Sequence, residues 1–425
     1  MTDSHSSLTI PLGERVIQWA DELAKHSDDV DQLTCTYLTP AHRKVADQLT
    51  RWMRQAGFVV KIDAVGNVIG RYAAAQGNAA APLVCTGSHY DTVRNGGRYD
   101  GRLGILIAIA LVASLNARNQ RFPFDLEVVA FADEESVRYR IPFLGSSAYA
   151  GYFQPEWLDA CDNQGTSMRQ ALHKAGLDPE MTKYTGADLS RLQQYFEVHI
   201  EQGPVLLDRG LPVGAVSGIA GSVGRILTLT GQAGHAGTTP MRLRRDALCA
   251  AAEIILCVEN RCSWTQGLVG TVSQVDIPTA SGNVVPGLCR LAMNVRAASD
   301  DVRDGALAEI DVMISEICSR RGIAWTCEET RRTRATPCDA DDRQRWKRAI
   351  AAQGIQPFAL TSGAGHDALV MARHAPISML FVRCGNGGIS HNPQETVTAH
   401  DVEIATCVTE RYLQELAGDM RQSTA

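Results

Sequence analysis

The sequence lacks an apolar run long enough to cross a bilayer, which argues against an integral membrane protein. No stretch approaches the roughly 20 consecutive apolar residues that a spanning helix needs. The first residues, M-T-D-S-H-S-S, have neither a basic flank nor an apolar core, so we expect no signal peptide. Long basic runs are missing too, and the formal net charge of −6 argues against a nucleic-acid partner.

Paired cysteine motifs are also absent. The chain has 12 cysteines but no C-x-x-C spacing. Several of them stand in apolar segments, namely Cys85, Cys249, Cys257 and Cys407. We therefore interpret them as buried, reduced thiols and expect a cytoplasmic protein.

A length of 425 residues allows two domains, and the apolar periodicity indicates how the first begins. Helical spacing over 15–27 and 41–56 precedes an alternating segment, 58–72, that predicts a β-hairpin. A short buried strand ending near Cys85, a helix over 104–117 and a strand over 126–131 then form a βαβ unit. Such a unit predicts an α/β fold with a parallel sheet and a site at the carboxyl ends of its strands.

The pattern changes near residue 214. The segments that follow have the order βαββαβ, which is typical of a ferredoxin-like domain. They are a strand over 225–230, a helix over 242–260, strands over 269–275 and 288–295, a helix over 302–320 and a strand over 323–328. Because helices and a buried strand return afterwards, we expect a split domain, 1–213 with 331–425, around an inserted domain, 214–330.

Polar residues follow the first buried strand. His89 and Asp91 are two apart, so in extended backbone their side chains leave on one face. A turn at Asn95-Gly96-Gly97 then brings Asp100 back in front of the helix. A histidine with nearby carboxylates at a sheet edge indicates a metal site. The alternative is a polar loop with one surface histidine.

Acidic and histidine residues follow the other predicted strands. The 126–131 strand runs into Asp133, Glu134 and Glu135, which either lie in solvent or face a cation, because buried like charges repel. A third strand carries His199, which is either a core residue or a ligand. The loop after the last strand supplies His391. Several parallel strands ending in such residues favour the metal site.

A series of motifs runs through the chain in a fixed order. They are G-S-H-Y-D-T-V, Y-D-G-R-L-G, D-E-E-S, E-V-H-I-E-Q-G-P, G-H-A-G-T-T-P-M, S-G-N-V-V-P, G-A-G-H-D-A and I-S-H-N-P-Q-E. Together they resemble the M20-type dinuclear metallohydrolases. The branch is that of the hydantoinase/carbamoylase amidohydrolases, which includes allantoate amidohydrolases, N-carbamoyl-L-amino acid hydrolases and yeast-type β-ureidopropionases. The resemblance implies a metallopeptidase-like α/β catalytic domain with a mixed, mainly parallel sheet and an inserted ferredoxin-like domain for closure and dimerisation.

The resemblance also implies a set of metal-binding residues. Asp100 would bridge two divalent ions, Zn²⁺ or Mn²⁺ with Co²⁺ as a third choice. Asp91 would hydrogen-bond to a ligand histidine, and Glu134 would be the general base. The implied ligands are His89, Asp100, Glu135, His199 and His391.

Substrate-binding residues are implied in the same way. His235 would stabilise the oxyanion from the partner subunit of a homodimer, and Asn283 with Arg296 would hold a substrate carboxylate. Gln202 and the backbone of Gly363, Ala364 and Gly365 would recognise the amide. The alternatives are that His235 caps a turn and that Arg296 is a surface charge.

The implied reaction is hydrolysis of a ureido or carbamoyl C–N bond by a metal-activated water, in purine or pyrimidine breakdown. Allantoate is our first choice of substrate, because D-T-V-R-N-G-G and Y-D-G-R-L-G are closest to allantoate enzymes. An N-carbamoyl-L-amino acid or β-ureidopropionate is the alternative, and a peptidase or a non-catalytic ureido binder is more remote. Departures at Arg94, Ser136 and Arg138 leave the substrate open, and the sequence settles neither the metal nor the stereochemistry.

Overall fold

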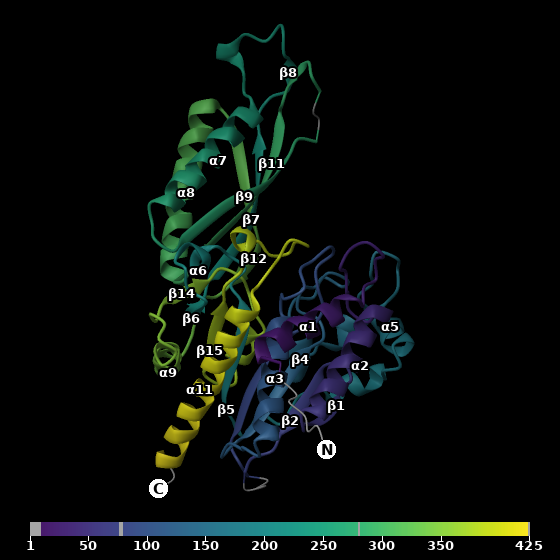
Figure 1. The fold of residues 1–425 in the computed structure, drawn as a ribbon. Helices are drawn as coiled ribbons and strands as arrows, with labels where there is room; N and C mark the ends of the chain where they lie inside the picture. Colours follow the sequence, from purple (N-terminus) through teal and green to yellow (C-terminus); the bar gives the residue numbers. More distant parts are fainter. Residues whose placement is uncertain (1–9, 76–79, 279–280, 424–425) are drawn as a thin grey trace, which may run out of the picture. The chain divides into compact units, whose positions relative to one another are not determined.

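The computed structural model describes residues 10–75, 80–278 and 281–423, and the chain divides into two units (Figure 1). The first comprises Met1–Ser217, Cys338–Leu360 and His366–Ala425, and the second Gly218–Pro337 and Thr361–Gly365. The boundaries thus fall a few residues after the predicted ones, at 213/214 and 330/331. The roles of the second unit in closure and dimerisation remain predictions. The segment used for the signal-peptide prediction lies outside the described residues.

A mixed sheet belongs mostly to the first unit, although β13 and the last two residues of β6 and of β14 fall within the second. Its strands run in the order β1-β2-β4-β3-β5-β15-β6, and β13 and β14 also pair with β6. Neighbours among β4, β3, β5 and β15 are parallel, whereas the pairs at β2 and β6 are antiparallel. The strands are β1 (Val59–Ile62), β2 (Val68–Tyr72), β3 (Leu83–His89), β4 (Asp125–Phe131), β5 (Leu192–Ile200), β6 (Val213–Ile219), β13 (Thr336–Pro337), β14 (Ala359–Ser362) and β15 (Ile377–Val382). This confirms the predicted hairpin and the mainly parallel sheet.

Helices cover this sheet. They are α1 (Leu12–Ala24), α2 (Pro40–Gln55), α3 (Arg102–Ala117), α4 (Leu144–Tyr149), α5 (Met168–Lys174), α6 (Val205–Asp208), α9 (Ala340–Ala351), α10 (Ala368–Met371) and α11 (Ala399–Ser423), with 3₁₀ turns η1 (Pro155–Asp159), η2 (Pro179–Tyr184) and η4 (Asn386–Gly388). Helix α3 is apolar around most of its circumference because it packs against β3, β4 and β5 on one side and α1 and α11 on another. It therefore fixes the turn that precedes it, which carries Asp100.

Strand β3 is longer than its sequence indicated. We expected it to end near Cys85, but it continues to His89, where it pairs with Phe131 of β4. The polar run does not end the strand because it stays buried and paired with β4 as far as His89. Gly87 allows this packing, since a Cβ there would lie 2.5 Å from the carbonyl oxygen of Val129. His89 is therefore the last strand residue, directly at the carboxyl edge of the sheet.

The second unit has the βαββαβ order that the sequence predicts. Its antiparallel sheet runs β12-β7-β11-β9, and α7 and α8 contact it and each other (Figure 1). Helix α7 begins at Ala247, after the predicted residue 242, because the Asp246 side chain accepts hydrogen bonds from two backbone N–H groups as the N-cap. The elements are β7 (Gly221–Thr230), β8 (Gly234–His235), η3 (Met241–Leu243), α7 (Ala247–Ser263), β9 (Leu268–Asp276), β10 (Val284–Val285), β11 (Leu288–Ala297), α8 (Asp300–Arg321) and β12 (Ala324–Thr333).

All 12 cysteines are free thiols, but they are not all buried. Cys85 lies in the core as predicted, whereas Cys249 is exposed, because it lies on the outer face of the first turn of α7. Cys161 and Cys327 are exposed as well. In the described part of the chain, no helix combines the length and the apolar character needed to span a bilayer.

Candidate metal centre

Four parallel strands deliver polar side chains to one edge of the first unit's sheet. His89 ends β3, and His199 is the next-to-last residue of β5. Glu135 lies in the loop after β4, and His391 lies in the loop after β15. Because β4, β3, β5 and β15 are parallel neighbours, these residues reach the same edge.

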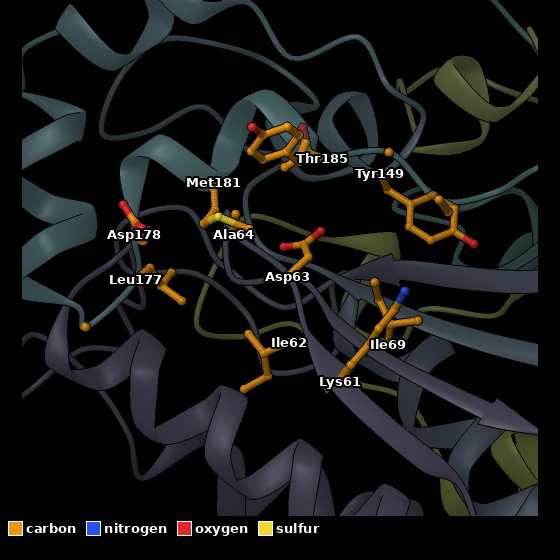
Figure 2. A pocket seen from close by; sticks show the side chains of 14 residues that line it. Lys61, Ile62, Asp63, Ala64, Ile69, Tyr149, Leu177, Asp178, Met181 and Thr185 are labelled. Atoms are coloured by element: carbon orange, nitrogen blue, oxygen red, sulfur yellow. The ribbon is translucent and has the colours of Figure 1, made fainter.

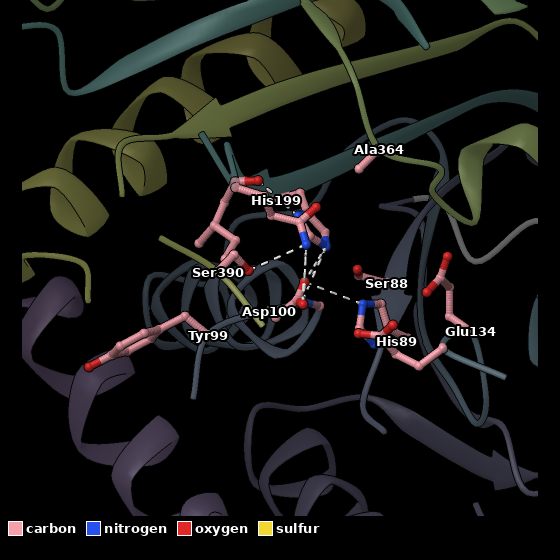
Figure 3. A network of polar contacts seen from close by, with 12 residues as sticks. Ser88, His89, Tyr99, Asp100, Glu134, His199, Ala364 and Ser390 are labelled. Atoms are coloured by element: carbon pink, nitrogen blue, oxygen red, sulfur yellow. Dashed lines mark hydrogen bonds and ion pairs between the residues drawn. The ribbon is translucent and has the colours of Figure 1, made fainter. Parts of the chain in front are cut away.

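Asp100 lies at the centre of this group (Figure 3). Its Oδ1 is 3.7 Å from His89 Nε2 and 3.4 Å from His199 Nε2, and its Oδ2 is 2.9 Å from His391 Nε2. Glu135 Oε1 is 3.3 Å from the same nitrogen of His391. The structure thus brings together all the side chains that the motifs implied as ligands.

The donor set fits a pair of divalent cations. Two groups of side chains have donor atoms within 4.8 Å of one another and share Asp100, one with His89 and His199, the other with Glu135 and His391. A shared carboxylate between two sets of nitrogen and oxygen donors is the arrangement that two-metal hydrolases use. Glu135 Oε1 is buried and makes no hydrogen bond, and its ion pair with His391 is with another candidate ligand of the same group.

Buried negative charge at the site also favours cations. Burial, followed by repulsion from Asp100, raises the pKa of Glu135 to about 8. Burial also raises the pKa of Glu134 well above its usual range, and repulsion from Glu135 adds to it. A bound cation would offset the unfavourable burial and the mutual repulsion of these negative charges.

The histidines respond to the same charges. The hydrogen bond to Asp100 raises the pKa of His391 to about 9, and burial lowers the pKa of His199 to about 4. Burial opposes protonation of His89, but Asp100 and Asp91 together raise its pKa well above the usual range. Since a cation binds neutral imidazole, loading the site should release protons.

Asp91 contacts both His89, at the end of β3, and the loop after β4 that carries Glu134 and Glu135. Its Oδ1 lies 3.4 Å from His89 Nδ1, as expected for a carboxylate that orients a ligand ring. Its two oxygens also accept hydrogen bonds from the backbone N–H groups of Glu134 (3.1 Å) and Glu135 (3.2 Å). One buried carboxylate therefore positions three residues of the site.

Three buried polar residues beside the ligands were not identified from the sequence. The His366 ring lies 4.5 Å from that of His199, and Glu197 accepts hydrogen bonds from Ser88 Oγ and the backbone of Ala368. Asp367 is fully buried, and its burial raises the pKa to about 7. The motif G-A-G-H-D-A contains His366 and Asp367, but the sequence analysis assigns a role only to the backbone of its first three residues.

Gln202 lies against the shared carboxylate. Its Nε2 donates to both oxygens of Asp100, at 3.1 and 3.2 Å, and lies 3.3 Å from His391 Nε2. The residue has a positive φ of 56°, which directs the side chain toward the ligands. Its proposed role in substrate recognition remains a prediction.

The second unit brings two of the predicted substrate residues together at a pair of short antiparallel strands, β8 and β10. His235 on β8 pairs with Val284 on β10, and Asn283 accepts a backbone hydrogen bond from Ala236. His235 Nδ1 accepts a hydrogen bond from the Gly237 N–H, so the ring does cap a turn. Its Nε2 remains the nitrogen that a ligand would contact.

Arg296 lies on strand β11 and is not a free surface charge. Its Nε donates to Asn294 Oδ1 (2.7 Å), and one terminal nitrogen donates to the Gly363 carbonyl (2.6 Å). Burial, with repulsion from Arg331, lowers its pKa. Gly363, Ala364 and Gly365 belong to the segment of the second unit that Arg296 contacts.

A separate cavity in the first unit is not the candidate site. It has a volume of about 410 Å³, and Figure 2 shows Ile62, Leu177 and Met181 among its lining side chains, with Asp63 and Asp178. None of the candidate ligands lines it. It therefore carries no part of the chemistry argued below.

Comparison with known proteins agrees with this geometry. Residues 85–415 match the family described as Peptidase family M20/M25/M40. The chain is 38% identical to an N-carbamoyl-L-amino acid amidohydrolase of Geobacillus stearothermophilus, over 95% of this chain and 98% of that protein. It is 37% identical to a probable allantoate deiminase of rice, Oryza sativa subsp. japonica, over 95% of this chain and 88% of that protein. A hydantoinase/carbamoylase family amidase from Burkholderia ambifaria has a similar structure, with a TM-score of 0.88, 31% identity and coverage of 95% and 97%.

Proposed function

This chain belongs to the M20/M25/M40 peptidase family, and from that premise we propose that it hydrolyses a ureido or carbamoyl C–N bond of a small carboxylate. The observation that carries the proposal is the convergence of four side chains with nitrogen or oxygen donor atoms around a fifth, Asp100, with Glu134 beside them. Relatives that cover nearly the whole chain are named for such substrates.

The residues of the first unit would have two different roles in this reaction, metal binding and proton transfer. His89, Asp100, Glu135, His199 and His391 would hold two divalent cations, which when bound supply Lewis acidity to a water and to the substrate carbonyl. Glu134 shares a group of donor atoms with His89 and Glu135, so it lies within reach of the same water. Its carboxylate takes the proton from that water and passes it to the leaving nitrogen.

Substrate recognition falls to the second unit in this proposal. Arg296 presents a guanidinium held by Asn294 and Gly363, and a held guanidinium binds a planar carboxylate in two-pronged fashion. His235, with Asn283 next to it where β8 pairs with β10, would stabilise the oxyanion.

Replacing Arg296 by Gln tests the carboxylate-binding role. We expect kcat/KM to fall about 10- to 100-fold, mostly through KM, because the lost interaction is a charge-assisted hydrogen bond that substrate and transition state share. Arg290→Gln is the matched control, since Arg290 is exposed on the same strand and faces Asp276. Equal losses in the two variants would mean that Arg296 has no specific role.

The substrate itself is best separated by assay. Allantoate is our first choice, with release of ammonia and carbon dioxide, and an N-carbamoyl-L-amino acid is the alternative that the Geobacillus relative favours. The experiment compares kcat/KM for allantoate, N-carbamoyl-L-amino acids, β-ureidopropionate and dipeptides with Mn²⁺ or Zn²⁺ added. Turnover of dipeptides alone would overturn the proposal.

We further propose a homodimer in which His235 acts on the partner's site. The edge strand β9 of the second unit supports an interface there, because Val269 is exposed and Trp264, just before the strand, is 87% exposed. Mixing Glu134→Gln with His235→Ala chains tests the arrangement. If His235 acts across the interface, one site of each hybrid dimer has both residues and activity returns. If His235 acts within its own chain, the mixture stays inactive.

A further inference from the structure

The motif I-S-H-N-P-Q-E ends in a glutamate that the proposed chemistry does not use. Glu395 is only 2% exposed. Its Oε1 accepts hydrogen bonds from the backbone N–H groups of Tyr99 (2.9 Å) and Asp100 (3.1 Å), nearly 300 residues earlier in the chain. The carboxylate thus holds the backbone of the shared ligand rather than its side chain.

The other oxygen of Glu395 holds the loop of a second ligand. Oε2 accepts a hydrogen bond from Ser390 Oγ (2.7 Å), and Ser390 immediately precedes His391. The Glu395 N–H also donates to the Asn392 carbonyl (3.0 Å), which closes a turn directly after His391. His391 has a positive φ of 53°, a conformation that is unfavourable for a non-glycine residue and so needs support from its surroundings.

The turn before Asp100 is packed directly against this carboxylate. A Cβ on Gly97 would lie 2.1 Å from the carboxyl carbon of Glu395, so only glycine fits at this contact. Glu395 therefore lies between the turn that carries Asp100 and the loop that carries His391. Burying a carboxylate is costly unless its oxygens are satisfied, and here three donors from the two segments satisfy them.

The two groups of ligands depend on this carboxylate to different degrees. His89 and His199 lie on paired strands, so the sheet positions them. His391 lies on a loop, 49% of its side chain is exposed, and the Glu395 carboxylate holds Ser390, the residue directly before it. We propose that Glu395 is a positioning residue that sets the affinity of the ion held by Asp100, Glu135 and His391, while the ion held by His89, Asp100 and His199 depends on it less. This inference rests on the metal centre of the proposed function.

Metal titration tests the proposal without reference to turnover. The full-length protein is stripped with a chelator and reloaded with Zn²⁺, and bound zinc is measured by mass spectrometry and by competition with a chromogenic indicator. The wild type should bind about two ions. Glu395→Ala should keep one tight ion and bind the other at least tenfold more weakly. Glu395→Gln should recover much of that loss, because its amide oxygen still accepts both backbone hydrogen bonds.

Glu403→Ala is the matched control. Glu403 also uses its carboxylate to hold a distant backbone group, the Gly13 N–H at 2.6 Å, but it contacts no metal-binding loop. It should change the melting temperature without changing the zinc titration. Ser390→Ala provides a milder test should Glu395→Ala not fold, since it removes one of the three hydrogen bonds and should weaken the same ion several-fold.

The outcomes separate this inference from the proposed function. A wild-type chain that binds no divalent ion would remove the metal centre and with it the proposed function. If the wild type binds two ions but Glu395→Ala and Ser390→Ala bind both with unchanged affinity, only the role of Glu395 is refuted. Equal weakening of both ions, or the same loss in Glu403→Ala, would also refute it, because those results indicate a general loosening of the fold.

Discussion

Glu134→Gln should lower kcat by about 10²- to 10⁴-fold and leave the bound metal unchanged. Glutamine keeps the size and hydrogen-bonding shape of the side chain but cannot accept a proton from the attacking water. The metal should remain because Glu135, not Glu134, shares a ligand group with Asp100 and His391. Purified variant and wild type are compared by steady-state turnover of the best ureido substrate and by metal content.

The control for this variant is Glu156→Gln, which removes one carboxylate from an exposed position in the first unit. It should match the wild type in both measurements. Wild-type turnover by Glu134→Gln would mean that another group accepts the proton. Loss of metal together with turnover would mean instead that Glu134 supports the ligands.

The sequence alone allowed much of the fold to be predicted because the determining signals are local. The βαββαβ order of the second unit and strand β15 follow from apolar periodicity within short windows. The predicted end of β3 was wrong because pairing with β4 keeps Thr86, Gly87 and Ser88 in the strand. Helix α5 was missed because its seven residues depend on a capping box at Ser167 and Gln170 rather than on a long amphipathic pattern.

In the candidate site, too, local features could be predicted from the sequence and long-range contacts could not. Its ligand residues could be named from ordered motifs, since each motif carries its own residue type. The contacts between motifs could not, because Glu395 with Asp100, Gln202 with Asp100, and His366 with His199 are distant in sequence and meet only in the folded chain. A backbone N–H can donate a hydrogen bond whatever the side chain of its residue. The residue types at Tyr99 and Asp100 therefore give no indication of their contact with Glu395.

Removal of the metal is the second change for which we expect a large effect. Chelation should abolish turnover, because the chain's own side chains offer no other Lewis acid to the substrate carbonyl. It should also make the stability of the protein fall as the pH rises from about 4.5 toward 8, between the ordinary and the raised pKa of the buried carboxylates, and above about 6.5 no lowered histidine pKa opposes this fall. The reason is that cations no longer offset the buried carboxylates.

The sign of that dependence follows from the raised pKa values. Burial raises the pKa of Glu135 and of Glu197 to about 8, so at neutral pH each holds a proton in the folded state that the unfolded chain has lost. Stability therefore falls as the pH rises toward 8. The pKa of His391, raised to about 9, acts in the same direction, because the proton that it shares with Asp100 is lost at higher pH. Burial lowers the pKa of His199 to about 4, which affects stability only below about pH 6.5.

Denaturant unfolding followed by circular dichroism measures this effect at pH 6.5 and pH 8. Each buried carboxyl group contributes about 2 kcal/mol over that interval, and because the groups repel one another we expect a total loss of about 2–4 kcal/mol for the chelated protein. The zinc-loaded protein should show a smaller change, since zinc keeps its ligand Glu135 ionised at both pH values, whereas Glu197 is not among the proposed ligands and still titrates. Zinc should therefore stabilise the protein more at pH 8 than at pH 6.5. A chelated protein with equal free energies of unfolding at both values would mean that these carboxylates are not held together in the way that the centre requires.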